Sequence, residues 1–300
     1  MILIAGSSGQ LGDALATLCA ARGIEFKAAA RPAFDFLHPE TVEACFKAAA
    51  PDLVINAAAY TAVDKAESDV AAATAGNHTG PLALAKLCEG RKIPFIHVST
   101  DYVFDGNKGA PYIETDPTGP TGVYGATKRD GEEAILATGA QAVILRTAWV
   151  YAAHGKNFAR TMLNAGRKMP QLRVVADQRG TPTAAPDLAE AILAIVAKIQ
   201  ETGWRPQYRG IFHATNAGET TWHGFATAIF AEAAKSGYAA PEVTPINTAD
   251  WPTPTRRPPD SRLDCGKLKE VFGVTLPDWR ETLPSIVHRL QTLDESPPPK

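Results

Sequence analysis

Short apolar runs of strand length alternate with longer alanine-rich stretches in the first half of the chain. The apolar runs lack the polar alternation of a half-exposed strand, so they predict strands that are buried on both faces. Such strands occur in parallel sheets that crossover helices cover on both sides, and the pattern therefore predicts an α/β fold with a doubly wound parallel sheet. The predicted strands are 1–5, 26–30, 53–55, 95–98 and 143–145, and the predicted helices are 11–22, 40–49, 70–89 and 125–137.

The pattern loosens after about residue 151. The run 241–259 holds six prolines, too many for regular structure, and we expect it to be an irregular surface loop over a ligand. Elsewhere in this half we predict helices at 157–168, 187–200 and 222–236, and strands at 172–175 and 211–214.

Composition and charge exclude several classes of protein. The 300 residues are 45% hydrophobic and 21% charged, with a formal net charge of -2, which is typical of a globular chain and gives no electrostatic basis for binding nucleic acid. No uninterrupted apolar run is long enough to span a membrane. The four cysteines are scattered without a CxxC pair, so we expect reduced thiols and a cytoplasmic protein.

A glycine-rich turn follows the first predicted strand. Its spacing, GxxGxxG, places glycines where a main chain approaches a pyrophosphate, and the unpaired N–H groups at the start of the next helix point at the anion. We therefore predict a Rossmann-type dinucleotide-binding domain over residues 1–150. Residues 151–300 are expected to form mostly a smaller substrate-binding lobe, with some segments returning to the Rossmann sheet. The candidate cofactor residues of the turn are Gly6, Ser8, Gly9, Gln10, Leu11 and Gly12.

The end of the second predicted strand indicates which dinucleotide binds. An NAD-selective site places an acid there for the ribose 2'-hydroxyl, whereas this chain has Arg31, whose guanidinium matches a 2'-phosphate. NADPH is therefore favoured, and NADH remains possible. Asp35 is the rival signal, and together with Phe36 it joins the candidate cofactor residues.

A phenol and an ammonium are predicted to lie on one face of a helix. Tyr124 and Lys128 are four residues apart at a predicted helix start, and Thr100 follows the preceding predicted strand. A nearby ammonium favours tyrosinate, so we expect Lys128 to lower the pKa of Tyr124 towards neutrality, with Thr100 hydrogen-bonded to the same oxygen. These three residues are the candidate catalytic set.

Several segments together resemble the extended short-chain dehydrogenase/reductase superfamily, and within it the chain is most similar to the dTDP-4-dehydrorhamnose reductase family. The likeness covers nearly the whole chain. The segments that carry it are 6–12, 56–64, 99–106, the Tyr124/Lys128 pair, 146–151, 177–183 and 257–263.

The resemblance implies reduction of the C4 ketone of dTDP-4-dehydro-L-rhamnose by NADPH, with Tyr124 as the proton donor. It also implies that Lys128 holds the nicotinamide ribose and that Thr100 steadies the developing alkoxide. Further cofactor contacts are expected from Ala57, Ala58 and Ala59. The expected substrate-binding residues are Val63, Thr100, Asp101, Tyr102, Trp149, Asn157 and Arg257, with Arg257 a partner for the sugar diphosphate.

Two departures from the family pattern limit this transfer. Gly122 stands where the family commonly has Asn, which predicts a looser turn before Tyr124. Ala14 stands where some members have an acid that holds a bridging magnesium ion, so we predict no structural metal and a monomer or weak homodimer. The histidines His78, His97, His213 and His223 lack metal-ligand spacing, and core or surface roles are expected for them.

Other functions stay open on the sequence alone. Sugar 4,6-dehydratases of the same superfamily follow the threonine with an Asp-Glu pair, whereas here Asp101 is followed by Tyr102. Another nucleotide-sugar reductase or a 4-epimerase would carry the same Thr-Tyr-Lys set. A non-catalytic regulatory subunit like that of methionine adenosyltransferase also resembles these reductases.

Overall fold

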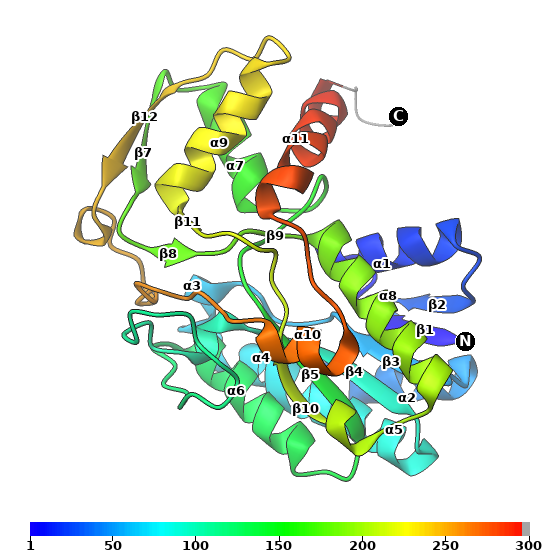
Figure 1. Ribbon diagram of the computed structural model, residues 1–300. Coiled ribbons are helices and arrows are strands. Elements are labelled where there is room, and N and C mark those ends of the chain that lie inside the picture. The colour runs from blue at the N-terminus through cyan, green and yellow to red at the C-terminus, as the bar shows by residue number, and fades with distance from the viewer. Residues whose placement is uncertain (296–300) are drawn as a thin grey trace.

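The computed structural model describes residues 1–295, and six parallel strands form its main sheet in the order β10-β5-β4-β3-β1-β2 (Figure 1). The doubly wound Rossmann-type sheet predicted from the sequence is confirmed. Its strands are β1 (Ile2–Ala5), β2 (Phe26–Ala29), β3 (Leu53–Asn56), β4 (Pro94–Thr100), β5 (Gln141–Thr147) and β10 (Gly210–His213).

Successive side chains of the sheet strands enter two different hydrophobic cores. In β1, Ile2 and Ile4 belong to the core that α1 and α8 cover, whereas Leu3 and Ala5 belong to the core under α2, α5 and α6. Because both faces are buried, the strands carry no polar alternation. The helices of these two layers are α1 (Gln10–Ala21), α8 (Ala185–Thr202), α2 (Pro39–Ala49), α5 (Gly80–Arg91) and α6 (Val123–Leu136).

The stretch 70–89 is not one helix. It is divided into α4 (Val70–Thr74), a π-helical turn (Ala75–Thr79) and α5. The wide turn brings the Asn77 amide to the backbone of Tyr60 and, at 3.1 Å, to the Thr127 hydroxyl of α6. The local distortion thus ties the loop after β3 to α6.

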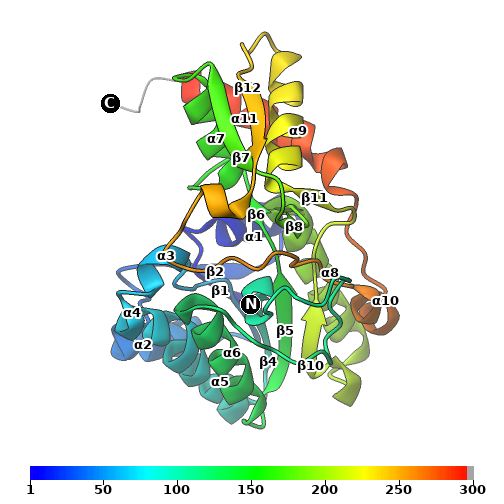
Figure 2. The same ribbon diagram turned by 90° about the vertical axis from the view of Figure 1, so that its left-hand side faces the viewer.

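The second half of the chain forms a separate hydrophobic cluster beside the sheet (Figure 2). Two helices pack there against a two-stranded parallel sheet and a third packs on one of them, while α8 and β10 return to the main sheet. The elements of this lobe are α7 (Phe158–Gly166), β7 (Gln171–Val175), α9 (Trp222–Ala234), β12 (Glu242–Ile246) and α11 (Trp279–Glu295). The short elements between the lobes are β6 (Val150–Tyr151), β8 (Arg179–Gly180), β9 (Thr183–Ala184) and β11 (Thr220–Thr221), and α10 (Gly266–Phe272) follows near the sheet.

The prediction of an irregular loop over 241–259 is wrong at its start. Residues 242–246 form β12, which pairs in register with β7. Pro245 is tolerated inside it because β12 is an edge strand, where a missing N–H need not face a neighbour. Of the helices in residues 1–295, none is long and apolar enough to cross a membrane.

The glycine-rich turn constrains how closely α1 approaches β1. A Cβ on Gly12 would overlap the Gly6 carbonyl, whereas a Cβ on Gly90, in α5, would meet nothing within 4 Å. We therefore expect Gly12→Ala to lower the free energy of unfolding by about 1–3 kcal/mol. The matched control Gly90→Ala should raise it by about 0.5 kcal/mol, because alanine is the better helix former. Urea unfolding of both variants measures this, and equal stability of Gly12→Ala and the wild type would contradict the packing argument.

Candidate functional site

The glycine-rich turn lies where three strands end. Gly6 adopts a φ of +81°, and a Cβ there would lie 2.5 Å from the Ala58 nitrogen. The Ala29 carbonyl at the end of β2 accepts hydrogen bonds from the N–H groups of Gly6 and Ser7, at 2.8 and 3.1 Å. Residues at the ends of β1, β2 and β3 thus form one surface at the carboxyl edge of the sheet, where ligands bind in open α/β folds.

The start of α1 offers hydrogen-bond donors to a ligand. Gly9 caps the helix without a side-chain acceptor, and the first bond within the helix runs from Asp13 N to Gly9 O. The N–H groups of residues 10–12 therefore have no partner inside the helix. The Leu11 side chain is buried in the core, so only its backbone can contribute. The Gln10 side-chain oxygen is buried without a partner among residues 1–295.

Arg31 follows β2 and is exposed. It makes no hydrogen bond or ion pair within the described part of the chain, so its guanidinium is available to an anion beside the turn. The rival residue Asp35 uses its carboxylate to accept from Leu37 N at 3.0 Å. Phe36 packs against Gly80 and edge-to-face on Phe34.

Tyr124 and Thr100 come together as the sequence predicts. Tyr124 lies in the first turn of α6, is nearly buried, and is hydrogen-bonded to the Thr100 side chain at the end of β4. The Tyr102 ring meets the Tyr124 ring edge-to-face at 5.5 Å. Burial raises the pKa of Tyr124, so the phenol keeps its proton at neutral pH.

Lys128 does not act on Tyr124 as expected. Its Nζ donates to the Val98 carbonyl at 2.6 Å and lies 3.3 Å from His97 Nε2. Burial lowers the pKa of Lys128 to about 8, and no effect of this ammonium offsets the burial of Tyr124. The expectation that Lys128 lowers the pKa of Tyr124 is therefore wrong for this arrangement.

Asp101 lies behind Thr100 and is only 1% exposed. Its Oδ1 accepts from the Thr100 hydroxyl at 3.0 Å, while Oδ2 has no partner among the described residues. Burial raises the pKa of this carboxyl to about 6. Asp101 was expected to bind substrate directly, but its burial leaves it to orient the Thr100 hydroxyl instead.

A chain-distant segment completes the site. Arg257 donates to the Tyr102 hydroxyl and to Asp64 Oδ2, both at 2.8 Å. The Thr255 hydroxyl donates to the Val63 carbonyl at 3.2 Å, so this segment is bound to α3 (Val63–Ala66). The sequence points to Arg257 but not to its pairing with Asp64, because the two residues are far apart in the chain.

Gly122 does not leave a loose turn before Tyr124. The Glu67 carboxylate accepts from Val123 N at 2.9 Å and so caps α6 from a neighbouring segment. A Cβ on Gly122 would lie 2.5 Å from the Thr255 methyl and 2.6 Å from Glu67 Oε1. The glycine therefore makes room for the groups that hold the turn.

The remaining candidates occupy the second half of the chain. The Trp149 indole is stacked on Trp222 with ring centroids 3.5 Å apart, and it packs against Gly180. Asn157 caps α7: its oxygen accepts from Arg160 N, and its amide donates to the Ala152 and His154 carbonyls. All polar groups of the Asn157 side chain are thus engaged in its own segment, which argues against a substrate contact.

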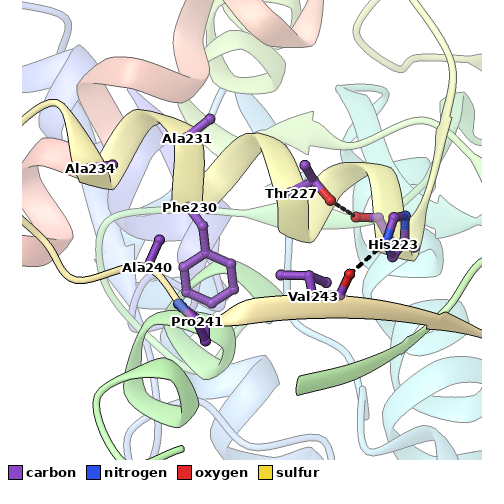
Figure 3. A pocket seen from close by; sticks show the side chains of 8 residues that line it. All are labelled: His223, Thr227, Phe230, Ala231, Ala234, Ala240, Pro241 and Val243. Carbon is purple, nitrogen blue, oxygen red and sulfur yellow. Dashed lines mark hydrogen bonds between the residues drawn. The ribbon is translucent and has the colours of Figure 1, made fainter. Parts of the chain in front are cut away.

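A separate apolar groove lies between α9 and residues 240–243 (Figure 3). His223 and Val243 are joined there by a hydrogen bond of 3.1 Å, and the groove contains none of the candidate site residues. Over residues 1–295 there is no group of three or more His, Cys, Asp or Glu side chains that could hold a metal ion.

Known proteins resemble this chain over nearly its full length. The family described as RmlD substrate binding domain matches residues 1–292. A dTDP-4-dehydrorhamnose reductase of Burkholderia thailandensis is 46% identical over 286 residues, which are 93% of this chain and 95% of that protein.

Two solved structures are also similar. A dTDP-4-dehydrorhamnose reductase of Clostridium acetobutylicum has a TM-score of 0.88 at 36% identity, over 97% of this chain and 99% of that one. A dTDP-4-dehydrorhamnose reductase of Bacillus anthracis in complex with NADP has a TM-score of 0.85 at 29% identity, over 95% and 97% of the two chains.

The raised pKa of Asp101 predicts a pH-dependent stability difference. The pKa of this carboxyl is about 6 in the folded chain and 3.8 in its ordinary state, so its ionisation lowers the free energy of unfolding above pH 6. The lost stability returns as the pH falls towards 3.8. The free energy of unfolding of Asp101→Asn, relative to the wild type, should therefore be higher at neutral pH than at about pH 4, by roughly 2–3 kcal/mol. Urea unfolding at both pH values measures it.

Asp105 provides a control of opposite sign. Hydrogen bonds from Asn107 and Tyr112 lower the pKa of this carboxyl, so its ionised form stabilises the fold. Asp105→Asn should therefore lose stability relative to the wild type as the pH rises. The same pH trend in both variants would mean that the fold favours the ionised form of Asp101, and it would contradict the raised pKa.

Proposed function

The chain belongs to the dTDP-4-dehydrorhamnose reductase family described by the RmlD substrate binding domain, and we propose on this premise that it reduces the C4 ketone of dTDP-4-dehydro-L-rhamnose to dTDP-L-rhamnose. It is an oxidoreductase that uses NADPH. The product serves rhamnose supply for cell-surface polysaccharide. The observation that carries the proposal is the buried, protonated Tyr124 bonded to Thr100 at the carboxyl end of β4.

The residues around the glycine-rich turn fit a phosphorylated dinucleotide. The backbone N–H groups at the start of α1 suit a pyrophosphate, and Gly6 lets the main chain come close to Ala58. The exposed Arg31 suits a 2'-phosphate. When bound there, NADPH supplies the hydride for the ketone carbon. The Bacillus anthracis relative was solved with NADP, which supports the same choice for this chain.

Tyr124 is the proton donor in this proposal. As the C4 oxygen of the substrate becomes an alkoxide, the phenol transfers its proton to that oxygen. The raised pKa keeps the proton on Tyr124 until a strong enough base develops beside it. Thr100 donates to the same oxygen when its hydroxyl turns away from Asp101, to which it donates at 3.0 Å in the structure. Lys128 would hold the nicotinamide ribose.

The sugar nucleotide is proposed to lie between the sheet edge and the second half of the chain. Val63 and Tyr102 flank Tyr124 in one cluster, and the stacked Trp149 offers an apolar wall. Arg257 is tied to Tyr102 and Asp64, so it both orients Tyr102 and places a cation near the diphosphate.

We further infer that residues 1–150, completed by α8 and β10, form the cofactor lobe and that most of 151–300 forms the substrate lobe. A cytoplasmic monomer or weak homodimer without a structural metal fits this function. The direct test is incubation of the protein with dTDP-4-dehydrorhamnose and NADPH, with loss of NADPH absorbance as the expected result. Conversion of the sugar without net NADPH consumption would contradict the proposal and favour an epimerase.

Tyr124→Phe and Lys128→Met should each lower kcat by about 100-fold or more, because one removes the proton and the other the ribose contact. Steady-state NADPH oxidation measures this. Tyr208→Phe is the matched control. Tyr208 is also buried, but it is hydrogen-bonded to Thr202, outside the candidate site, so this variant should keep the kcat of the wild type. A Tyr124→Phe variant with a normal rate at neutral pH would remove the proton-donor role.

Arg31→Ala should weaken NADPH binding by about tenfold or more and leave NADH binding nearly unchanged, because only NADPH has a 2'-phosphate to pair. Titration calorimetry with both cofactors measures the effect. Arg91→Ala removes an exposed arginine from the end of α5, beside the opposite edge of the sheet, and should change neither affinity. Equal weakening of NADPH and NADH by Arg31→Ala would contradict the pairing.

Arg257→Ala should raise the KM for the sugar nucleotide several-fold and leave NADPH affinity unchanged, because its contacts lie on the substrate side. Steady-state kinetics and NADPH titration separate the two effects. Arg256→Ala, one residue earlier and exposed, is the control. Unchanged KM in Arg257→Ala would remove the proposed anion contact.

A further inference from the structure

His97 is a fully buried histidine that the proposed mechanism leaves without a role. It lies in the middle of β4, opposite Asn56 of β3, and its ring stacks beside Phe95. Its two nitrogens face two different side chains. Nδ1 lies 2.9 Å from the Asn56 amide nitrogen, and Nε2 lies 3.3 Å from Lys128 Nζ.

The orientation of the Asn56 amide determines where the histidine proton lies. Asn56 Oδ1 accepts from Ala58 N at 3.1 Å, so the oxygen points to the backbone and the NH₂ group points to His97. An amide NH₂ can only donate, and His97 Nδ1 must therefore accept. Burial lowers the pKa of His97 well below its ordinary value, so the ring is neutral and carries its proton on Nε2.

The N–H on Nε2 then points at Lys128. An ammonium has no lone pair and cannot accept that hydrogen bond, whereas a neutral amine accepts it and still donates to the Val98 carbonyl at 2.6 Å. The other tautomer would accept from the ammonium, but it would put two N–H donors 2.9 Å apart at Asn56. The buried polar groups of Asn56, His97 and Lys128 are all satisfied only when Lys128 is a neutral amine.

The neighbouring charges do not reverse this preference. Glu132, one turn further along α6, favours the ammonium, but both of its oxygens accept from Arg146 of β5, and the Ser99 hydroxyl also donates to it. Tyr124, on the other side, is a neutral phenol, and Asp101 is bonded to Thr100. Burial therefore lowers the pKa of Lys128 to about 8.

We propose that His97, oriented by Asn56, is a positioning residue. It donates a hydrogen bond from Nε2 to Lys128 and so makes the neutral amine of Lys128 accessible near neutral pH. The lysine can then gain and lose a proton beside the ribose it holds. This inference rests on the proposed function for its use in turnover, but the hydrogen-bond arrangement exists in the protein without substrate or cofactor.

The tautomer is tested first, by nitrogen NMR of the full chain labelled on histidine, without cofactor. His97, assigned by its loss in His97→Gln, should be neutral with its proton on Nε2 from about pH 6 to about pH 9. A proton on Nδ1 would overturn the proposal. Because no sugar is present, this result does not depend on the proposed substrate.

The protonation of Lys128 is tested next, by carbon NMR of the lysine Cε, with Lys128→Met for assignment. His97→Gln should raise the titration midpoint by about one pH unit, because the Gln oxygen can accept from the ammonium. Asn56→Asp should raise it too, since a carboxylate accepts from Nδ1 and reverses the tautomer. His213→Gln, at a second buried histidine bonded to the Tyr112 carbonyl, is the control and should leave the midpoint unchanged.

The same variants separate the proposal from the proposed function. The pH profile of kcat in His97→Gln should shift by the same amount as the midpoint, with KM for the sugar unchanged. A midpoint that stays in place in both His97→Gln and Asn56→Asp would overturn the inference. If the wild-type protein reduced none of the sugars tested, only the proposed function would be overturned, because the NMR results would stand.

Discussion

The close approach of α6 to its neighbours places both Tyr124 and Lys128. A Cβ on Gly125 would overlap the Tyr102 carbonyl, and one on Gly131 would overlap the Asn77 carbonyl. These two glycines thus let the helix backbone lie against the segment after β4 and against the π-helical turn. Tyr124 and Lys128, four residues apart, project from the same side of the helix, and both are buried.

Burial, rather than pairing of opposite charges, controls the protonation of this site. The Tyr124 phenol and the Lys128 amine both shift towards their neutral forms, and so does the Asp101 carboxyl. The buried ion pair between Glu132 and Arg146 is the contrast, since each charge there has a bonded partner. Neutral acids and bases suit a reaction in which charge develops on a substrate oxygen and is then quenched.

Local patterns in the sequence predict the main sheet and the chemistry at its edge. The five strands of the first half lie at the expected places, because buried parallel strands leave an apolar signature of their own, and the glycine-rich turn is recognisable from its spacing. The structure differs from the prediction where contacts between distant segments determine the local secondary structure. β12 forms among prolines because β7 supplies a partner strand. The helices α10 and α11 are not among the predicted elements.

The candidate site shows the same division. The sequence identifies Thr100 and Tyr124 by type and position, but it gives no measure of burial, and so the direction of the pKa of Tyr124 is predicted wrongly. The ties from Arg257 to Asp64 and from Thr255 to Val63 join residues almost two hundred positions apart. They depend on how the second half of the chain lies against α3, which no local pattern records.

Gly122 has a consequence for how this chain can diverge from its relatives. The space that a side chain would need at this position is filled by the Glu67 carboxylate and the Thr255 methyl group, one of which caps α6. An asparagine introduced here alone would collide with both. The three positions are therefore coupled. A lineage that acquires a side chain at residue 122 must change Glu67 or Thr255 before this substitution or together with it.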